Sequence, residues 1–228
     1  MVEELIGALT MKACWKRLVE VLTPGVRVLL GVLVAVWVAA VLGQVLKAYD
    51  LPGWLVLSGP QCWHGQVWRL ATYALVPAGV LDLLLNGVAL ALLGGLLERH
   101  WSRGEFWGYC LVAALGAGLA KAGLDGSGPL PLMGAAPMAF GLLIAWGFLC
   151  GRESIMLPVW GAATVWQLIL VAAGVSLLTM VFTAGLKLAL IVAAGGLAGY
   201  IYLWLKHQWL MRRAAGVVHS ERISRLEL

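Results

Sequence analysis

The sequence predicts an all-α, polytopic membrane protein with six transmembrane helices, and three observations support this fold class. Hydrophobic residues make up 62% of the 228 residues, charged residues make up 12%, and the mean hydropathy is +0.92, which lies outside the range of soluble domains. Six apolar segments each approach the roughly 20 residues that a helix needs to cross the hydrocarbon core. Charged or turn-forming residues separate these segments.

We expect one membrane domain with two polar ends that are too short to bury a core of their own. The membrane domain covers 25–205, an interfacial cytoplasmic helix covers 1–24, and a basic cytoplasmic tail covers 206–228. The N-terminal segment repeats apolar residues on one helical face, at Leu5, Leu9, Trp15, Leu18 and Leu22. This pattern is typical of a helix that lies on the membrane surface.

The spans are expected on either side of one long irregular loop. That loop, 47–77, combines prolines and glycines with several aromatic residues, which favour the headgroup level of the bilayer. We therefore expect a membrane-embedded first loop instead of a flexible linker. The spans are expected at 26–46, 80–97, 106–124, 133–151, 160–180 and 186–205.

The distribution of basic residues predicts the orientation. Six spans place both termini on one side, and 12 of the 16 Lys and Arg residues then fall on that side. The other four are Lys47, Arg69, Lys121 and Lys187. By the positive-inside rule, both termini are expected in the cytoplasm, with the chain in the plasma (inner) membrane. The net charge of +5 therefore reflects orientation in the lipid bilayer, and no nucleic-acid partner is expected.

The cysteines indicate neither a disulfide framework nor a metal site. They are scattered along the chain, without a CxxC motif or a nearby Cys/His spacing, at Cys14, Cys62, Cys110 and Cys150. We therefore expect no metal and no other cofactor.

Four motifs follow one another along the predicted spans. The first loop contains the pair Trp68 and Arg69, and the second span contains Asp82 and Asn86 one helical turn apart, with Glu98 at its end. Small residues mark the other two motifs, at Gly134 and Gly141 in the fourth span and at Gly195 and Gly199 in the sixth. In this order, the motifs resemble the rhomboid family of intramembrane serine proteases from about residue 26 to 205.

The resemblance implies a six-span fold around a serine and a histidine. In the family, the serine opens the fourth span and attacks the peptide carbonyl, and a histidine on the sixth span accepts its proton. In this sequence the serine position holds Ala136, and Pro137 replaces the following glycine and its N–H donor. The histidine position falls on Val192 or Ala193, depending on which glycine sets the register.

The oxyanion site implied by the resemblance is also altered. The family uses a histidine and an asparagine on the second span, and this chain keeps Asn86 but has Asp82 at the histidine position. A carboxylate there would repel an oxyanion, and a charge within a span costs about 2.5 to 3.5 kcal/mol. Asp82 either pairs with Arg69, Lys121 or Lys187 and braces the outer ends of the spans, or it reaches nearby water.

The remaining motif residues have structural interpretations. Trp68 and Arg69 are expected to stabilise the first loop, with the guanidinium group bound to loop carbonyls. Glu98 is expected to fasten the cytoplasmic end of the second span. The small residues, including Gly195 and Gly199, predict close helix packing, either within the bundle or between copies of the chain.

The sequence permits three functions for this chain. The first is a rhomboid pseudoprotease that binds single-pass transmembrane client proteins without cleaving them. The resemblance implies a lateral gate for such clients, bordered by Trp160, Trp166 and Gln167 on the fifth span. The second is an active peptidase with relocated residues, for which Ser58, Cys62 and His64 are the candidates. The third is a transporter or channel, although the sequence lacks paired broken helices and a ring of charges.

Overall fold

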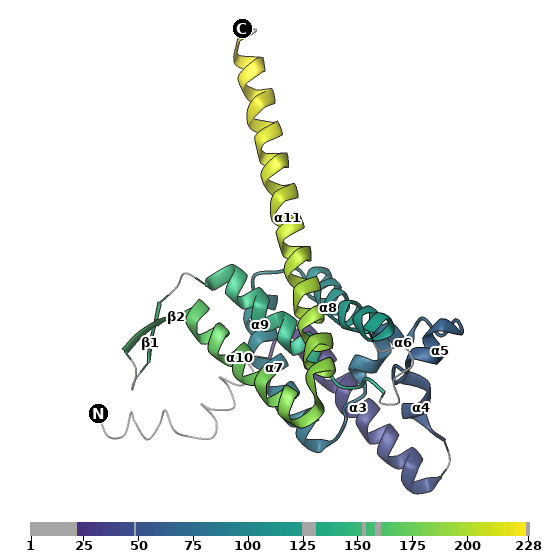
Figure 1. The fold of residues 1–228 in the computed structure, drawn as a ribbon. Coiled ribbons are helices and arrows are strands. Elements are labelled where there is room, and N and C mark those ends of the chain that lie inside the picture. The colour runs from purple at the N-terminus through teal and green to yellow at the C-terminus, as the bar shows by residue number, and fades with distance from the viewer. Residues whose placement is uncertain (1–21, 48, 125–130, 152–153, 158–160, 227–228) are drawn as a thin grey trace.

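In the computed structural model, six helices within the described residues form the bundle (Figure 1). The structure describes residues 22–47, 49–124, 131–151, 154–157 and 161–226. The helices are α3 (Pro24–Leu46), α7 (Val80–Glu98), α8 (Arg103–Leu124), α9 (Ala136–Cys150), α10 (Val165–Ala184) and α11 (Leu186–Leu226). Within the described residues, five of them are long and apolar enough to cross a membrane. The predicted all-α polytopic bundle is confirmed.

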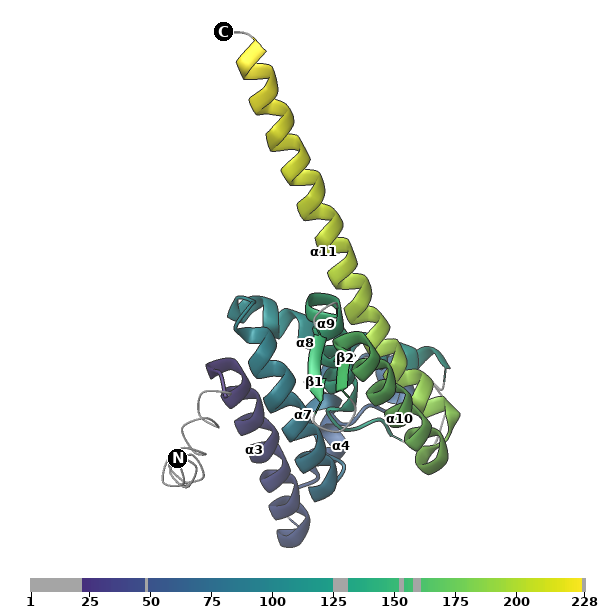
Figure 2. The same cartoon turned by 90° about the vertical axis from the view of Figure 1, so that its left-hand side faces the viewer.

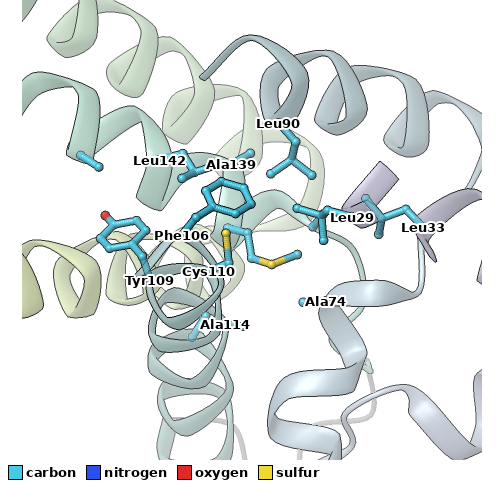
Figure 3. Close-up of a cluster of buried hydrophobic side chains, with 14 of the residues drawn as sticks. Leu29, Leu33, Ala74, Leu90, Phe106, Tyr109, Cys110, Ala114, Ala139 and Leu142 are labelled. Carbon is cyan, nitrogen blue, oxygen red and sulfur yellow. The ribbon is translucent and has the colours of Figure 1, made fainter. Parts of the chain in front are cut away.

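The helix α9 is the shorter apolar helix, and it lies at the centre of the bundle. Its 15 residues extend only about 22 Å, and it packs against α7, α8, α10 and α11. Neighbouring helices cover it, so it does not need the full width of the bilayer. The buried cluster in Figure 3 joins Ala139 and Leu142 of α9 to Leu90 of α7 and Phe106 of α8.

The first loop is folded, as predicted, and it forms short helices beside α3 and α8. These are α4 (Leu51–Leu55), α5 (Gly59–Trp63), α6 (Arg69–Thr72) and the 3-10 helix η1 (Tyr73–Leu75). Leu57 and Leu132 exchange two backbone hydrogen bonds of 3.1 and 2.8 Å, and the Tyr73 hydroxyl donates to the Ala114 carbonyl at 2.8 Å. The loop is therefore attached both to α8 and to the segment that leads into α9.

The prediction that the fifth span begins at residue 160 is wrong. A two-stranded antiparallel hairpin, β1 (Ser154–Leu157) and β2 (Gly161–Thr164), precedes α10, which begins at Val165. A capping box decides this start, because the Thr164 N–H donates to Gln167 Oε1 at 2.9 Å and the Gln167 N–H donates to the Thr164 hydroxyl at 3.4 Å. Sequence reasoning missed this Thr-x-x-Gln signal.

The last helix continues through the boundary expected between residues 205 and 206. In Figures 1 and 2, α11 projects far beyond the bundle, and it ends at Leu226 after 41 residues. The Lys206 ammonium group forms an ion pair with Glu105 at the start of α8. The proposed interfacial helix in 1–24 falls almost entirely outside the described residues, which begin at Leu22.

Candidate functional site

The positions implied by the resemblance come together around one cavity of about 500 Å³, here called the central cavity. Asp82 and Asn86 of α7, Ala136 of α9 and Val192 of α11 all line it. Of the two residues expected at the histidine position, Val192 is among the described lining residues and Ala193 is not. On the fourth side, α10 contributes Ala172, Ser176, Leu177 and Met180.

The turn that places Ala136 depends on glycine. Gly134 has φ of +99°, and its N–H donates to the Tyr73 carbonyl at 3.2 Å. A Cβ at Gly134 would lie only 3.0 Å from Asp82 Oδ2. Pro137 occupies the first turn of α9, where a missing N–H costs no helical hydrogen bond. The loop-to-helix turn is thus intact, while Ala136 offers a methyl group to the cavity.

The carboxylate of Asp82 accepts hydrogen bonds from its own helix and from the backbone just before that helix. Asn86 Nδ2 donates to Asp82 Oδ1 at 2.6 Å, and the Ala78 N–H donates to Asp82 Oδ2 at 3.1 Å. Asp82 also lies in the first turn of α7, where the helix dipole favours a negative charge. The amide of Asn86 is therefore engaged with a carboxylate, and this side of the cavity is electronegative where an acyl-transfer enzyme needs hydrogen-bond donors.

None of the three cationic partners considered for Asp82 is among the described residues that line the central cavity. Arg69 directs Nη1 to the Val56 carbonyl at 2.6 Å and Nε to Gln66 Oε1 at 2.5 Å. Lys121 and Lys187 line a separate cavity. The hydrogen bonds that the structure gives Asp82 come from Asn86 and from the N–H of Ala78, which lies just before α7. The bracing hypothesis therefore receives no support from Arg69.

Ser176 is a lining residue that sequence reasoning missed. Its hydroxyl donates to the Ala172 carbonyl one turn earlier at 2.7 Å. Thr179 and Thr183 make the same type of bond, so this repeat of hydroxyl residues along an apolar helix was the available signal. Among the described residues that line the central cavity, none is a histidine, cysteine or lysine that could activate Ser176.

The relocated catalytic residues considered above remain in the first loop. Ser58 donates its hydroxyl proton to Gln61 Oε1 at 2.7 Å, and His64 is exposed. Neither Ser58, Cys62 nor His64 belongs to the described lining of the central cavity. A base that accepts a proton from Ser58 would have to displace Gln61 first.

The proposed gate residues occupy the start of α10. The Trp166 N–H donates to the Gly151 carbonyl at 3.2 Å and its ring packs against Gly147 and Gly151, while Gln167 caps the helix. Neither belongs to the described lining of the central cavity, and Trp160 lies outside the described residues. The α10 surface that faces the cavity lies two to four turns further along.

Two motif residues have the structural roles predicted for them. The Arg69 guanidinium group donates to the Val56 carbonyl, which is the contact with a loop carbonyl expected of it. The Glu98 carboxylate accepts hydrogen bonds from the N–H groups of Gly25 and Val26 at 2.8 and 3.0 Å, and from the Thr23 hydroxyl. Glu98 therefore joins the end of α7 to the start of α3.

Replacing Arg69 by lysine is expected to lower the free energy of unfolding by about 1 to 3 kcal/mol. An ammonium group cannot reach Val56 and Gln66 with the geometry of the guanidinium fork, so a buried carbonyl loses its donor. Thermal unfolding in detergent measures the loss of stability, and the rate of proteolysis within the first loop shows whether that loop is loosened. Trp68→Phe is the control, because the Trp68 indole makes one long bond of 3.4 Å to Trp54 and should have little effect. Equal effects of the two changes would contradict the assigned role.

Comparison with known protein families identifies the chain. The family model for the Rhomboid domain matches residues 64–209, which include the first-loop motif and the helices α7 to α11 up to Trp209. The chain is a member of the rhomboid family. As a rhomboid with apolar helices long enough to span a bilayer, it is an integral membrane protein. A comparison with curated proteins finds no match.

Proposed function

We propose that this rhomboid protein binds transmembrane helices of single-pass client proteins and does not cleave them. The observation that carries the proposal is the composition of the central cavity. Ala136 and Val192 present hydrocarbon groups where acyl transfer needs a nucleophile and a base, and Asp82 presents a carboxylate where it needs an oxyanion donor. The capacity that remains at this site is binding.

The packing of α10 supports a lateral route for a client helix. The helix α10 packs against α9 and α11, and the central cavity separates its middle from α7. Val165 and Ile169 near its start are its buried residues. On the other side of the route, α7 exposes Leu81, Leu85 and Val88. A client helix could contact these apolar side chains without leaving the hydrocarbon core.

The turn after α10 supports movement of that helix. Gly185 has φ of +88°, and a Cβ there would have no neighbour within 4 Å. A cavity of about 500 Å³ accommodates side chains of a client, whereas a complete helix needs more room. We therefore propose that α10 pivots near Gly185 when a client helix binds.

We further propose that the protein resides in the plasma membrane. Both termini then lie in the cytoplasm, as the distribution of basic residues predicts. The end of α11 supports this, since Lys206, Arg212 and Arg213 follow the apolar part of the helix. The Arg213 guanidinium group lies 4.9 Å from the ring centre of Trp209, a pairing that suits the headgroup region. The residues 206–228 are then a basic cytoplasmic extension of the membrane domain.

Site-specific photocrosslinking tests the binding function. A photoreactive phenylalanine at Ser176 faces the central cavity, and the same group at Leu170 is the matched control, because Leu170 is an exposed residue of α10 outside the described cavity lining. With a panel of single-span membrane proteins in proteoliposomes, we expect crosslinks from position 176 that exceed those from position 170. Equal yields at both positions would show contact with passing lipid-embedded helices and contradict the proposal.

Peptidase assays test the absence of cleavage in the same proteoliposomes. The wild type and the Ala136→Ser variant are both expected to leave every client intact, because Val192 cannot accept a proton. A serine-reactive fluorophosphonate is expected to label neither Ser58 nor Ser176. Cleavage by the wild type, or labelling of either serine, would overturn the pseudoprotease assignment in favour of a relocated active site.

A further inference from the structure

The central cavity contains a carboxylate whose charge is not balanced within the cavity. Asp82 is the one acidic residue among the described lining residues, and none of those residues is a lysine, an arginine or a histidine. The carboxylate accepts its hydrogen bonds from the Asn86 amide and the Ala78 N–H, which are both neutral donors. These bonds orient the carboxylate and leave its negative charge without a counterion in the described lining.

The carboxylate of Asp82 keeps room for a further donor. An ionised carboxylate has about four acceptor positions on its two oxygens. Here Oδ1 accepts from Asn86 at 2.6 Å and Oδ2 accepts from the Ala78 N–H at 3.1 Å, one hydrogen bond for each oxygen. The position of Asp82 in the first turn of α7 also favours a negative charge. A donor from outside the chain can therefore add to the existing contacts without replacing them.

The central cavity opens to the surroundings of the bundle between α7 and α10. Leu85 lines the cavity, is 64% exposed, and follows Asp82 by three residues, so the two side chains share one face of α7. On the opposite side, Ala172 and Ser176 of α10 line the cavity and are also exposed. A side chain of a neighbouring transmembrane helix can thus enter between α7 and α10, on the face that carries the carboxylate.

Hydrocarbon surrounds the polar groups of this cavity. Leu93, Phe140 and Leu143 are among its lining residues. Opposite charges attract more strongly in such surroundings than in water, and a charged group within a span usually has a partner. An apolar side chain of a client would leave the Asp82 carboxylate without a counterion. A lysine or an arginine would supply both a positive charge and N–H donors.

We propose that Asp82 selects client helices that carry a lysine or an arginine near the membrane face at which α7 begins. The inference rests on the proposed client binding and names the class of client. Asp82 is the third residue of α7, so it lies within about one turn of that face. The hydrocarbon stem of the client side chain packs along the apolar walls, and its cationic group pairs with the carboxylate.

A series of client helices tests the proposal in proteoliposomes. One single-span client is made with lysine, glutamine, leucine or glutamate at a position about two turns inside the membrane face where α7 begins. Energy transfer between fluorophores on the two proteins measures binding. We expect the lysine form to bind about tenfold more tightly than the leucine form, which corresponds to about 1.4 kcal/mol. The glutamine form should bind with intermediate strength, and the glutamate form most weakly.

A lysine moved to the opposite end of the same client span is the control for composition. This form has the same charge and hydrophobicity, but its ammonium group cannot reach Asp82 at the start of α7. We expect it to bind like the leucine form. Equal binding of the two lysine forms would overturn the proposal, because the location of the charge would then not matter.

Variants assign the selection to Asp82. In Asp82→Asn, the ratio of lysine-form to leucine-form binding is expected to fall to about one, whereas Asp82→Glu should retain the preference because the charge remains. Asp50→Asn is the matched control. Asp50 lies in the first loop, outside the described cavity lining, and asparagine can still accept the hydrogen bond from the Gly53 N–H. An equal fall of the ratio in Asp82→Asn and Asp50→Asn would show general attraction between charges and refute the selection.

The experiment separates this inference from the proposed function. Failure of every client form to bind the wild type would overturn client binding and the selection with it. Equal binding of all forms would overturn the selection alone. Thermal unfolding shows whether Asp82→Asn is folded, and if it is not, the two lysine forms with the wild type still decide the question.

Discussion

Replacing Glu98 by glutamine is expected to lower the free energy of unfolding by about 2 to 3 kcal/mol, measured by thermal or denaturant unfolding in detergent. Glu98 is 8% exposed, and both of its carboxylate oxygens accept hydrogen bonds from the start of α3. A glutamine replaces one oxygen with an NH2 group, which cannot accept from Gly25 or Val26. At least one buried N–H then loses its partner, and the negative charge at the helix N-terminus is lost.

Glu105→Gln is the matched control for this experiment. Glu105 begins α8 and forms an ion pair with Lys206, and both side chains keep part of their solvent exposure, at 17% and 34%. An ion pair that keeps contact with solvent contributes less than a buried carboxylate that accepts several hydrogen bonds, so the control should have a smaller effect. If Glu105→Gln destabilises the protein as much as Glu98→Gln, the junction between α7 and α3 does not have the importance that we assign to it.

Replacing Gly195 by alanine is expected to lower the free energy of unfolding by about 1 to 3 kcal/mol, in the range of overpacked cores. A Cβ at Gly195 would lie 2.8 Å from the Ala113 carbonyl oxygen and 3.0 Å from Pro137 Cβ. These contacts come from α8 and α9, so α11 cannot relieve one contact without moving against the other. Thermal unfolding of the purified variant in detergent measures the effect.

Gly174→Ala provides the contrast, because a Cβ at Gly174 of α10 would have no neighbour within 4 Å. Alanine has a higher helix propensity than glycine, so this variant should be neutral or slightly more stable. The same substitution is thus expected to lower the free energy of unfolding at Gly195 and to leave it unchanged or raise it slightly at Gly174. A neutral Gly195→Ala variant would show that α8, α9 and α11 are packed less closely than the structure indicates.

The sequence predicted much of the fold, because membrane insertion depends on local composition. The apolar segments became helices, and Arg69 and Glu98 have the structural roles expected from their positions. The start of α10 was predicted wrongly because hydropathy does not distinguish a hairpin from the first turn of a helix. The Thr164 and Gln167 capping pair contained the missing information.

The candidate site was predicted less completely. Sequence reasoning named Asp82 and Asn86 but left open whether Asp82 pairs with a cationic side chain or reaches water. It did not foresee the hydrogen bonds that Asp82 accepts from Asn86 and the Ala78 N–H. Those partners follow from the exact start of α7, which hydropathy does not define to within a residue. Ser176 was missed because the repeat of hydroxyl residues along α10 marks polar positions on an apolar helix, and only the packing of α10 shows that Ser176 lines the cavity.

By itself, the sequence determined that the chain belongs in a bilayer and that Ala136 stands at the start of the fourth apolar segment, since both are properties of residue identity and order. Tertiary structure decided that Val192, and not Ala193, lines the cavity with Ala136. The physical reason is the rotation of α11 about its own axis, because this rotation determines which of its side chains face the cavity. Gly195 packs closely against Ala113 and Pro137, and this contact limits the rotation. Only packing between helices distant in sequence can select that rotation.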